Sequence, residues 1–151
     1  MIKIEISAEN FDVGSEVAEL SARGGGAIAS FIGQVRGDEH LEALELEHYP
    51  AMTKTSLFSI AETADKRWSL HGITIVHRVG RMNLGDQIVL VCTSSDHRQA
   101  ALEACSYIMD RLKTDAPFWK KQWYADGSSE WVDERQSDID AKNKWQNTWS
   151  N

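Results

Sequence analysis

The chain has few cysteines and few prolines, and each scarcity is informative. Cys92 and Cys105 stand in apolar surroundings, without a C-x-x-C pair or the spacing of metal ligands. We therefore expect two buried, unreactive thiols and no metal site. The two prolines are Pro50 and Pro117. Pro50 is placed to begin a helix, and Pro117 is placed to end one.

The chain also lacks a long apolar run and an excess of basic residues. No stretch is long enough to cross a membrane, and the opening MIKIEISAEN shows no basic region followed by an apolar one. We therefore expect a cytoplasmic protein without a membrane partner. The net charge of −7 argues against nucleic acid as a partner. Only the interleaved Trp119, Lys120 and Trp123 suggest a single-stranded RNA site, and the overall acidity opposes it.

The chain contains enough apolar sequence for one core. Its 151 residues, 42% of them hydrophobic, fit a single domain over 1–151 with a polar tail at 136–151. Hydrophobic periodicity predicts an α+β fold. Strands are expected at 1–6, 27–35, 41–49, 73–79, 87–93 and 118–124, and helices at 13–22, 50–68 and 97–113.

Shorter features complete this prediction. A loop carrying Gly80 and Gly85 is expected between the strands at 73–79 and 87–93. Asp126-Gly127 predicts a hairpin turn that leads into a short strand at 130–132. The polar tail is expected to hold a short helix with Trp145 and Trp149 one turn apart.

The third long helix begins in a sequence suited to binding an anion. We expect Asp96 to cap this helix, with Gln99 as its capping-box partner. His97 and Arg98 then fall in the first turn, where backbone N–H groups are unpaired and the potential is positive. A bound anion would satisfy these groups, so this end of the helix predicts a site for an anionic ligand.

Basic residues also gather where this helix ends. Lys113 closes the helix, Pro117 prevents its continuation, and Lys120 and Lys121 follow. From position 97 to position 121 there are five Lys/Arg against three Asp/Glu, which runs against the acidity of the whole chain. Local basicity in an acidic protein indicates a small anionic ligand rather than a polyanion.

Five segments occur in an order that resembles a known family. They are FIGQVRG at 31–37, LELEHYPAM at 44–52, HRVGRMNLGD at 77–86, SSDHR at 94–98 and LKTDAPFWKK at 112–121. So ordered, they resemble the large, catalytic subunit of molybdopterin synthase. The resemblance extends from the first strand to about position 135. It implies an α/β hammerhead fold with an additional antiparallel β-sheet region.

The resemblance also implies a reaction and its partners. The family's large subunit binds a small ubiquitin-like carrier whose C-terminal Gly-Gly ends in a thiocarboxylate. Sulfur passes from this tail to cyclic pyranopterin monophosphate and forms the dithiolene of molybdopterin, with two carrier tails consumed for each product. The expected assembly is a homodimer of large subunits within a heterotetramer. No metal or organic cofactor is implied, because molybdenum is inserted later by other proteins.

The family motifs assign roles to particular residues. Lys113 is expected to be the leading catalytic lysine, and Lys120 its partner in proton transfer or charge stabilisation. A lysine serves as an acid or base near neutral pH when burial or neighbouring cations favour its neutral form. The resemblance further implies a phosphate or pterin pocket, built from one subunit or from two, and a channel for the carrier tail. The residues assigned to these are Arg36, His97, Arg98 and, more loosely, Arg135 for the pocket, and Phe31 for the channel.

Each assignment has a simpler structural alternative. A lysine at a helix C-terminus is favoured by the helix dipole alone, and lysines on an extended segment are usually solvated. Arg36 could pair with Asp38 or Glu39, and His97 could be an ordinary surface residue. Phe31 fits a core position, while His48 and His77 fit hydrogen-bonded structural positions on strands. Gln122 stands where many relatives are expected to carry an acidic residue.

The rival function is a non-catalytic module that docks a ubiquitin-like tail or a phosphorylated metabolite. It would use the same anion pocket without chemistry. The second lysine distinguishes the two functions, because binding a carboxylate or phosphate does not require both Lys113 and Lys120 around a proline turn. The sequence therefore favours the sulfurtransferase.

Overall fold

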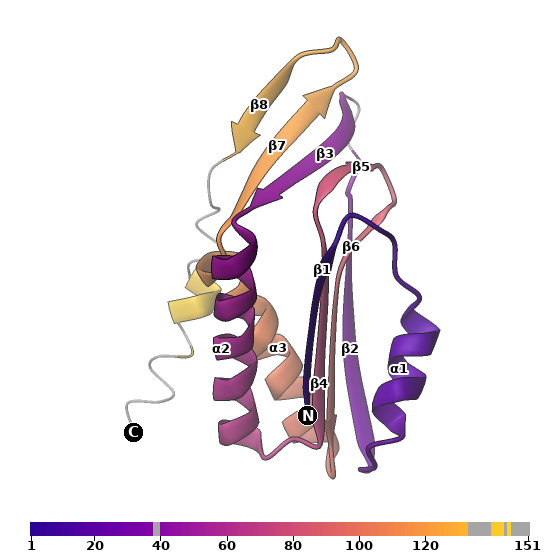
Figure 1. Cartoon of the computed structure of the whole chain (residues 1–151), viewed down its shortest axis with the longest axis vertical. Coiled ribbons are helices and arrows are strands. Elements are labelled where there is room, and N and C mark those ends of the chain that lie inside the picture. The colour runs from indigo at the N-terminus through magenta and orange to yellow at the C-terminus, as the bar shows by residue number, and fades with distance from the viewer. Residues whose placement is uncertain (38–39, 133–139, 144, 146–151) are drawn as a thin grey trace.

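The fold was obtained as a computed structural model, which describes residues 1–37, 40–132, 140–143 and 145. Within these residues the strands form two four-stranded sheets, and the long helices cover the first of them (Figure 1). The elements are β1 (Ile2–Ser7), α1 (Val13–Ser21), β2 (Ala27–Gln34), β3 (Leu41–His48), α2 (Pro50–Trp68), β4 (Gly72–Arg78), β5 (Gly80–Asn83), β6 (Gln87–Ser95), α3 (Arg98–Asp115), β7 (Phe118–Tyr124) and β8 (Ser129–Val132).

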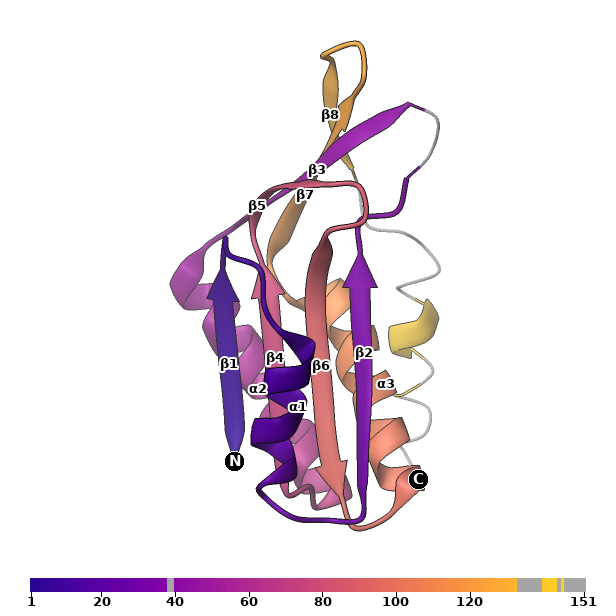
Figure 2. The ribbon, with the colours of Figure 1, turned by 90° about the vertical axis from the view of Figure 1, so that its right-hand side faces the viewer.

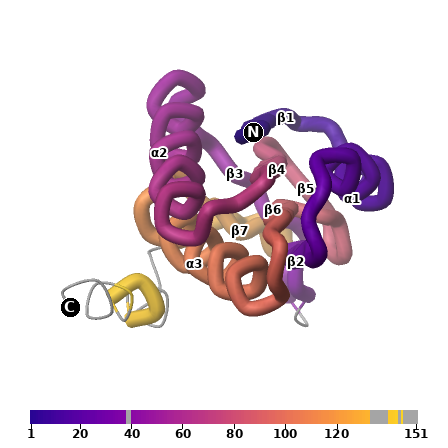
Figure 3. Tube along the Cα trace, turned by 90° about the horizontal axis from the view of Figure 1, so that it is seen from below, coloured from indigo at the N-terminus to yellow at the C-terminus, as the bar shows by residue number. Residues whose placement is uncertain are grey.

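The first sheet has the strand order β1-β4-β6-β2. β1 runs parallel to β4, and the β4–β6 and β6–β2 pairs are antiparallel. α2 and α3 pack side by side on one face, and α1 covers the other (Figures 2 and 3). Because both faces are covered, six of the seven residues of β4 are buried.

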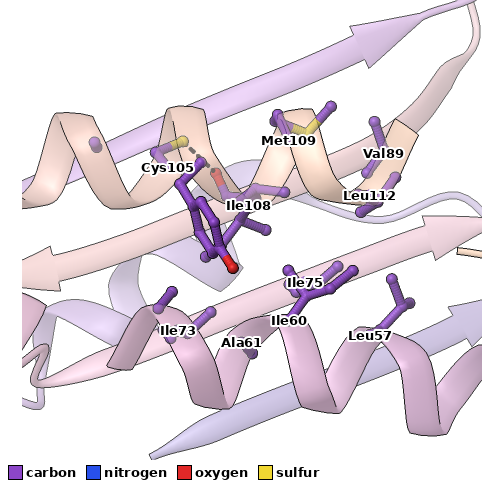
Figure 4. Packing of buried hydrophobic residues seen from close by; sticks show 14 of the residues in the cluster. Leu57, Ile60, Ala61, Ile73, Ile75, Val89, Cys105, Ile108, Met109 and Leu112 are labelled. Carbon is purple, nitrogen blue, oxygen red and sulfur yellow. Dashed lines mark hydrogen bonds between the residues drawn. The ribbon is translucent and has the colours of Figure 1, made fainter. Parts of the chain in front are cut away.

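The main core lies between this sheet and the pair α2 and α3. Leu57 and Ile60 of α2 pack with Ile108 and Leu112 of α3 over Ile75 of β4 (Figure 4). These positions repeat every three or four residues on each helix, as the sequence predicted. A smaller cluster under α1 joins Leu20, Val76, Leu90 and Cys92.

Both cysteines are buried, as expected. Burial raises the pKa of the Cys92 thiol to about 11 and that of the Cys105 thiol to about 12. The Cys105 Sγ also contacts the carbonyl oxygen of Val91 at 3.7 Å. Both side chains therefore stay protonated near neutral pH and serve as small core residues.

The second sheet is antiparallel, has the order β5-β3-β7-β8 and projects beyond one end of the first (Figure 1). β5 corrects the prediction of a loop between β4 and β6. The segment pairs with β3 because Met82, only 1% exposed, packs with Val35, Leu44 and Leu46. The mixed helix and strand content with a separate antiparallel sheet confirms the predicted fold class.

The start of α3 corrects a second prediction. His97, not Asp96, is the N-cap, and its side chain makes no capping hydrogen bond. The Asp96 carboxylate instead accepts a 2.6 Å hydrogen bond from His71 Nε2, which lowers the pKa of Asp96. Gln99 donates to Glu103 one turn later rather than returning to the cap. His71, which directly precedes β4, therefore binds the Asp96 carboxylate that would otherwise cap α3.

The tail folds back onto α3 where it is described. Residues 140–143 and 145 are helical, as predicted, and Trp149 lies outside the described residues. The Trp145 ring meets Trp68 and Tyr107 edge-on, with centroids 5.9 and 5.7 Å away, and its Nε1 donates to Asp110 at 2.6 Å. In the described part of the chain, no helix combines the length and apolarity needed to span a membrane.

Candidate functional site

A cleft of about 730 Å³ opens where the second sheet meets the end of the first. The last residues of β2 and β4, the final turn of α3 and the inner face of β3 and β7 line it. Four residues predicted for the site lie together here: Phe31, Arg36, Lys113 and Lys120. The cleft is therefore the candidate active site.

Lys113 and Lys120 reach the cleft from the two sides of a tight turn. Lys113 lies in the last turn of α3, and the helix ends at Ala116 because Pro117 cannot continue it. The Phe118 N–H then donates to the Ala116 carbonyl at 2.9 Å, which reverses the chain into β7. Strand alternation from Phe118 places Lys120 and Gln122 on the face toward the cleft.

The same alternation places Lys121 on the face of β7 opposite Lys120. The Lys121 Nζ lies over the rings of Trp123 and Trp131, 4.6 and 5.4 Å from their centroids. Lys121 is not among the residues that line the cleft. The choice of Lys120 over Lys121 for the site thus agrees with their placement in β7.

The cleft combines positive charge with apolar walls. Arg36, Lys113 and Lys120 line it, whereas none of its described lining residues carries a carboxylate. Apolar lining side chains include Leu44, Leu46 and others of the second sheet's inner face. A charge near an apolar wall is less screened than one in bulk water, so the cleft attracts an anionic ligand that also has apolar parts.

Phe31 differs from the core position that its residue type suggested. Its side chain is 42% exposed and lies at the cleft. Arg36 is exposed just beyond β2, and its suggested ion-pair partners, Asp38 and Glu39, lie outside the described residues. Phe31 and Arg36 are thus both exposed where they line the cleft.

His97 and Arg98 lie at the other end of α3 from Lys113. Fifteen residues separate Arg98 from Lys113, which is about 22 Å along an α-helix. Both His97 and Arg98 are exposed, and neither lines the cleft of its own chain. One chain therefore does not bring the five predicted basic residues together. The sixth, Arg135, lies outside the described residues.

His77 is a cleft residue that sequence reasoning assigned only to the structure of a strand. It is the penultimate residue of β4, is 4% exposed and lines the cleft. Its ring stacks on Phe118 with centroids 3.9 Å apart and an interplanar angle of 17°. Burial, together with the nearby charges of Lys113 and His48, lowers the pKa of His77 to about 4, against a hydrogen bond with the Arg78 carbonyl that favours the charged ring.

The sequence offered no signal for this position beyond the end of a buried strand. The expected hydrogen bond of His77 is confirmed, since its Nδ1 lies 2.8 Å from the Arg78 carbonyl oxygen. His48 differs: its Nδ1 is buried without a hydrogen-bond partner among the described residues. The described residues also contain no group of three His, Cys, Asp or Glu side chains that could hold a metal ion.

Comparison with known proteins places the chain in one family. The family model described as MoaE protein matches residues 6–115. The molybdopterin synthase catalytic subunit of Vibrio cholerae is 45% identical over 149 residues, covering 95% of this chain and 98% of that one. The Escherichia coli protein of the same name is 43% identical over 147 residues, covering 95% and 97%.

Solved structures agree with this result. The molybdopterin biosynthesis MoaE protein from Burkholderia ambifaria superimposes with a TM-score of 0.83 at 47% identity, covering 97% of this chain and 99% of that one. A complex of subunits 1 and 2 of molybdopterin-converting factor from Helicobacter pylori contains a chain with a TM-score of 0.74 at 25% identity, with coverages of 89% and 91%. Together with the basic cleft, these matches show that the chain belongs to the MoaE protein family.

Proposed function

We propose that this protein is the catalytic subunit of molybdopterin synthase. It transfers sulfur from the C-terminal thiocarboxylate of a small ubiquitin-like carrier to cyclic pyranopterin monophosphate in molybdenum cofactor biosynthesis, in the cytoplasm. The relatives from Vibrio cholerae and Escherichia coli are named molybdopterin synthase catalytic subunit. The observation that supports it best is the pairing of Lys113 and Lys120 around the Pro117 turn, in a cleft whose described lining has no carboxylate.

The chemistry needs cationic groups but no nucleophile from this chain. The carrier's sulfur attacks a carbon of the pyranopterin and forms a new C–S bond, while the C–O bond at that carbon breaks and its oxygen leaves as water or with the phosphate. Water then cleaves the bond between that sulfur and the carrier's acyl carbon, which leaves a carboxylate on the carrier and a thiol on the product. The buried thiols of Cys92 and Cys105 agree with a reaction in which the partner brings the sulfur.

Lys113 and Lys120 fit the hydrolytic half of this reaction. Attack of water on the acyl carbon places a negative charge on its oxygen, and an ammonium group beside that oxygen stabilises it. A lysine can also deliver the proton that the departing thiolate takes up. We assign Lys113 to the end of the carrier tail and Lys120 to the partner role in charge stabilisation or proton transfer. Phe31, exposed beside the cleft, is assigned to the channel that the tail enters.

The phosphate of the substrate requires further donors. Arg36 can make two hydrogen bonds to one phosphate from its planar guanidinium group. His97 and Arg98 are too far from the cleft of their own chain, so we assign them to the cleft of a second copy in a homodimer. There the positive N-terminal end of α3 would add its unpaired N–H groups to the same anion site.

A single-turnover assay tests the proposal. Purified protein is mixed with thiocarboxylated carrier and cyclic pyranopterin monophosphate, and the dithiolene product is followed by chromatography. Lys113→Ala and Lys120→Ala should each lower the rate by about 100-fold or more, because a positioned proton donor contributes that much. Lys121→Ala is the matched control, since it removes the adjacent lysine from the opposite face of β7, and it should keep the rate within about twofold.

Two results would contradict these assignments. Near-normal turnover by Lys113→Ala would remove the proposed role of that lysine. A folded wild-type protein that binds the carrier and forms no product would favour the non-catalytic docking module instead.

A further inference from the structure

His77 joins the first sheet to the turn that separates the two lysines. It is the penultimate residue of β4, an inner strand of the first sheet, and its ring lies nearly parallel to that of Phe118, the first residue of β7. The centroid separation of 3.9 Å is close to van der Waals contact for stacked rings. Any movement of the 116–118 turn must therefore displace the His77 ring.

The hydrogen bond of His77 defines its tautomer. A backbone carbonyl oxygen only accepts hydrogen bonds, so the Nδ1 atom, 2.8 Å from the Arg78 oxygen, must carry the hydrogen. On a neutral ring this leaves a lone pair on Nε2. That atom has no hydrogen-bond partner among the described residues, and the residue lines the cleft. Nε2 is therefore available as an acceptor.

The surroundings keep this ring neutral. It is almost fully buried, which disfavours a charged imidazolium. Lys113 from α3 and His48 from β3 both act against its protonation, and only the Arg78 carbonyl favours it. A protonated His77 would also place a positive charge beside Lys113. A permanently neutral ring is a poor proton carrier, but it is a stable acceptor for an ammonium group.

We propose that His77 is a positioning residue for sulfur transfer, which holds the Phe118 turn by stacking and presents Nε2 to the cleft as the acceptor that the Lys113 ammonium group takes up during turnover. This inference rests on the proposed function of the cleft, since it assigns to His77 the placing of a lysine whose chemistry is itself proposed. The residue needs no contact with the substrate. It acts through Lys113 and through the turn that leads to Lys120.

Two substitutions separate the stacking from the hydrogen bonds. His77→Phe keeps an aromatic ring against Phe118 and removes the Nε2 acceptor, whereas His77→Asn keeps a donor for the Arg78 carbonyl and removes the ring. His48→Phe is the matched control. The His48 ring also neighbours that of Phe118, with centroids 6.1 Å apart, but His48 does not line the cleft that contains Lys113 and Lys120.

The kinetic test measures kcat and KM for thiocarboxylated carrier with each variant, after thermal unfolding shows that it is folded. Both His77 variants should lose about tenfold in kcat while KM changes by less than about twofold, because the residue places a reacting group rather than binding the carrier. His48→Phe should match the wild type. Values of kcat within about twofold of wild type for both folded His77 variants would overturn the proposal.

A second measurement needs no variant. Nitrogen-15 NMR of the wild-type imidazole groups should show His77 with its proton on Nδ1 and a bare Nε2 from about pH 5 to about pH 9. A proton on Nε2, or a titration within that range, would overturn the proposal even if the variants failed to fold. The NMR result does not depend on turnover. It therefore tests the role of His77 separately from the proposed function, which fails if the wild-type protein makes no product.

Discussion

At the scale of single residues, His77 couples the stability of the fold to pH. Its pKa is about 4 in the folded chain, mainly because burial disfavours the charged ring, against an ordinary value of 6.5. As pH falls through this interval, the unfolded chain binds more protons at this site than the folded chain, so the free energy of unfolding decreases. The loss is about 3 kcal/mol on going from pH 6.5 to pH 4.

Urea unfolding at several pH values tests this coupling. His77→Phe should remove this part of the pH dependence, so its free energy of unfolding should fall less steeply than that of the wild type on acidification. The carboxylates titrate in both proteins, so their contribution to the pH dependence cancels when the two slopes are compared. Parallel slopes would mean that His77 does not carry the predicted proton linkage.

Residue chemistry explains which site residues the sequence could identify. Lys113 and Lys120 flank Pro117, and a proline-terminated helix followed by a strand leaves few ways to place them, so their meeting in one cleft follows from local rules. Arg36 and Phe31 could be placed only through the family motif. His77 could not be identified, because its place in the cleft depends on how β4 meets β7, two elements distant in the chain.

At the scale of elements, Trp145 attaches the described part of the tail to α2 and α3. Trp145 contacts Trp68 and Tyr107 and donates a hydrogen bond to Asp110. Lys142 adds an ion pair with Asp115 at 2.8 Å. Trp145→Ala removes the aromatic contacts and the hydrogen bond together, and it should lower the free energy of unfolding by about 2 kcal/mol for this half-buried side chain.

Thermal unfolding monitored by circular dichroism checks this effect, and Trp131→Ala is the control. Trp131 is 52% exposed on β8, so its loss should change stability by less than about 0.5 kcal/mol. Equal melting temperatures for wild type and Trp145→Ala would show that the tail contributes nothing to the fold.

The elements also show where periodicity predicts structure well and where it fails. α2 and β7 were predicted with the bounds that they have, since each combines an apolar pattern with a proline at or just before its start, and β1 was predicted within one residue from its alternation of apolar and polar side chains. β5 has only four residues, of which Gly80 is the first, so it is too short to show a pattern, and it becomes a strand because it pairs with the edge of β3. The N-cap of α3 failed because His71 competes for Asp96.

At the scale of the whole molecule, the separation of Arg98 from Lys113 makes a prediction about assembly. The two residues stand at opposite ends of α3, about 22 Å apart by helix rise, so one rigid helix cannot bring both to one substrate. The helix predicted at 97–113 already implied this separation, although the sequence analysis left open whether one subunit or two build the pocket, and the structure confirms that α3 is unbroken. If both residues act at one site, two copies must share it.

Mixing two variants, each impaired at a different residue of the proposed site, tests whether two copies share it. In the proposed homodimer, each cleft takes Lys113 from one copy and Arg98 from the other. When a Lys113→Ala chain pairs with an Arg98→Ala chain, one cleft therefore carries both substitutions and the other carries neither. Random exchange gives such pairs in half of the dimers, so mixing should restore about a quarter of the wild-type sites. Turnover per site is measured after the separately purified variants are mixed and allowed to exchange. A site built within one chain would gain nothing from mixing, so activity that stays at the level of the separate variants, while mass spectrometry shows mixed dimers, would place Arg98 outside the catalytic site.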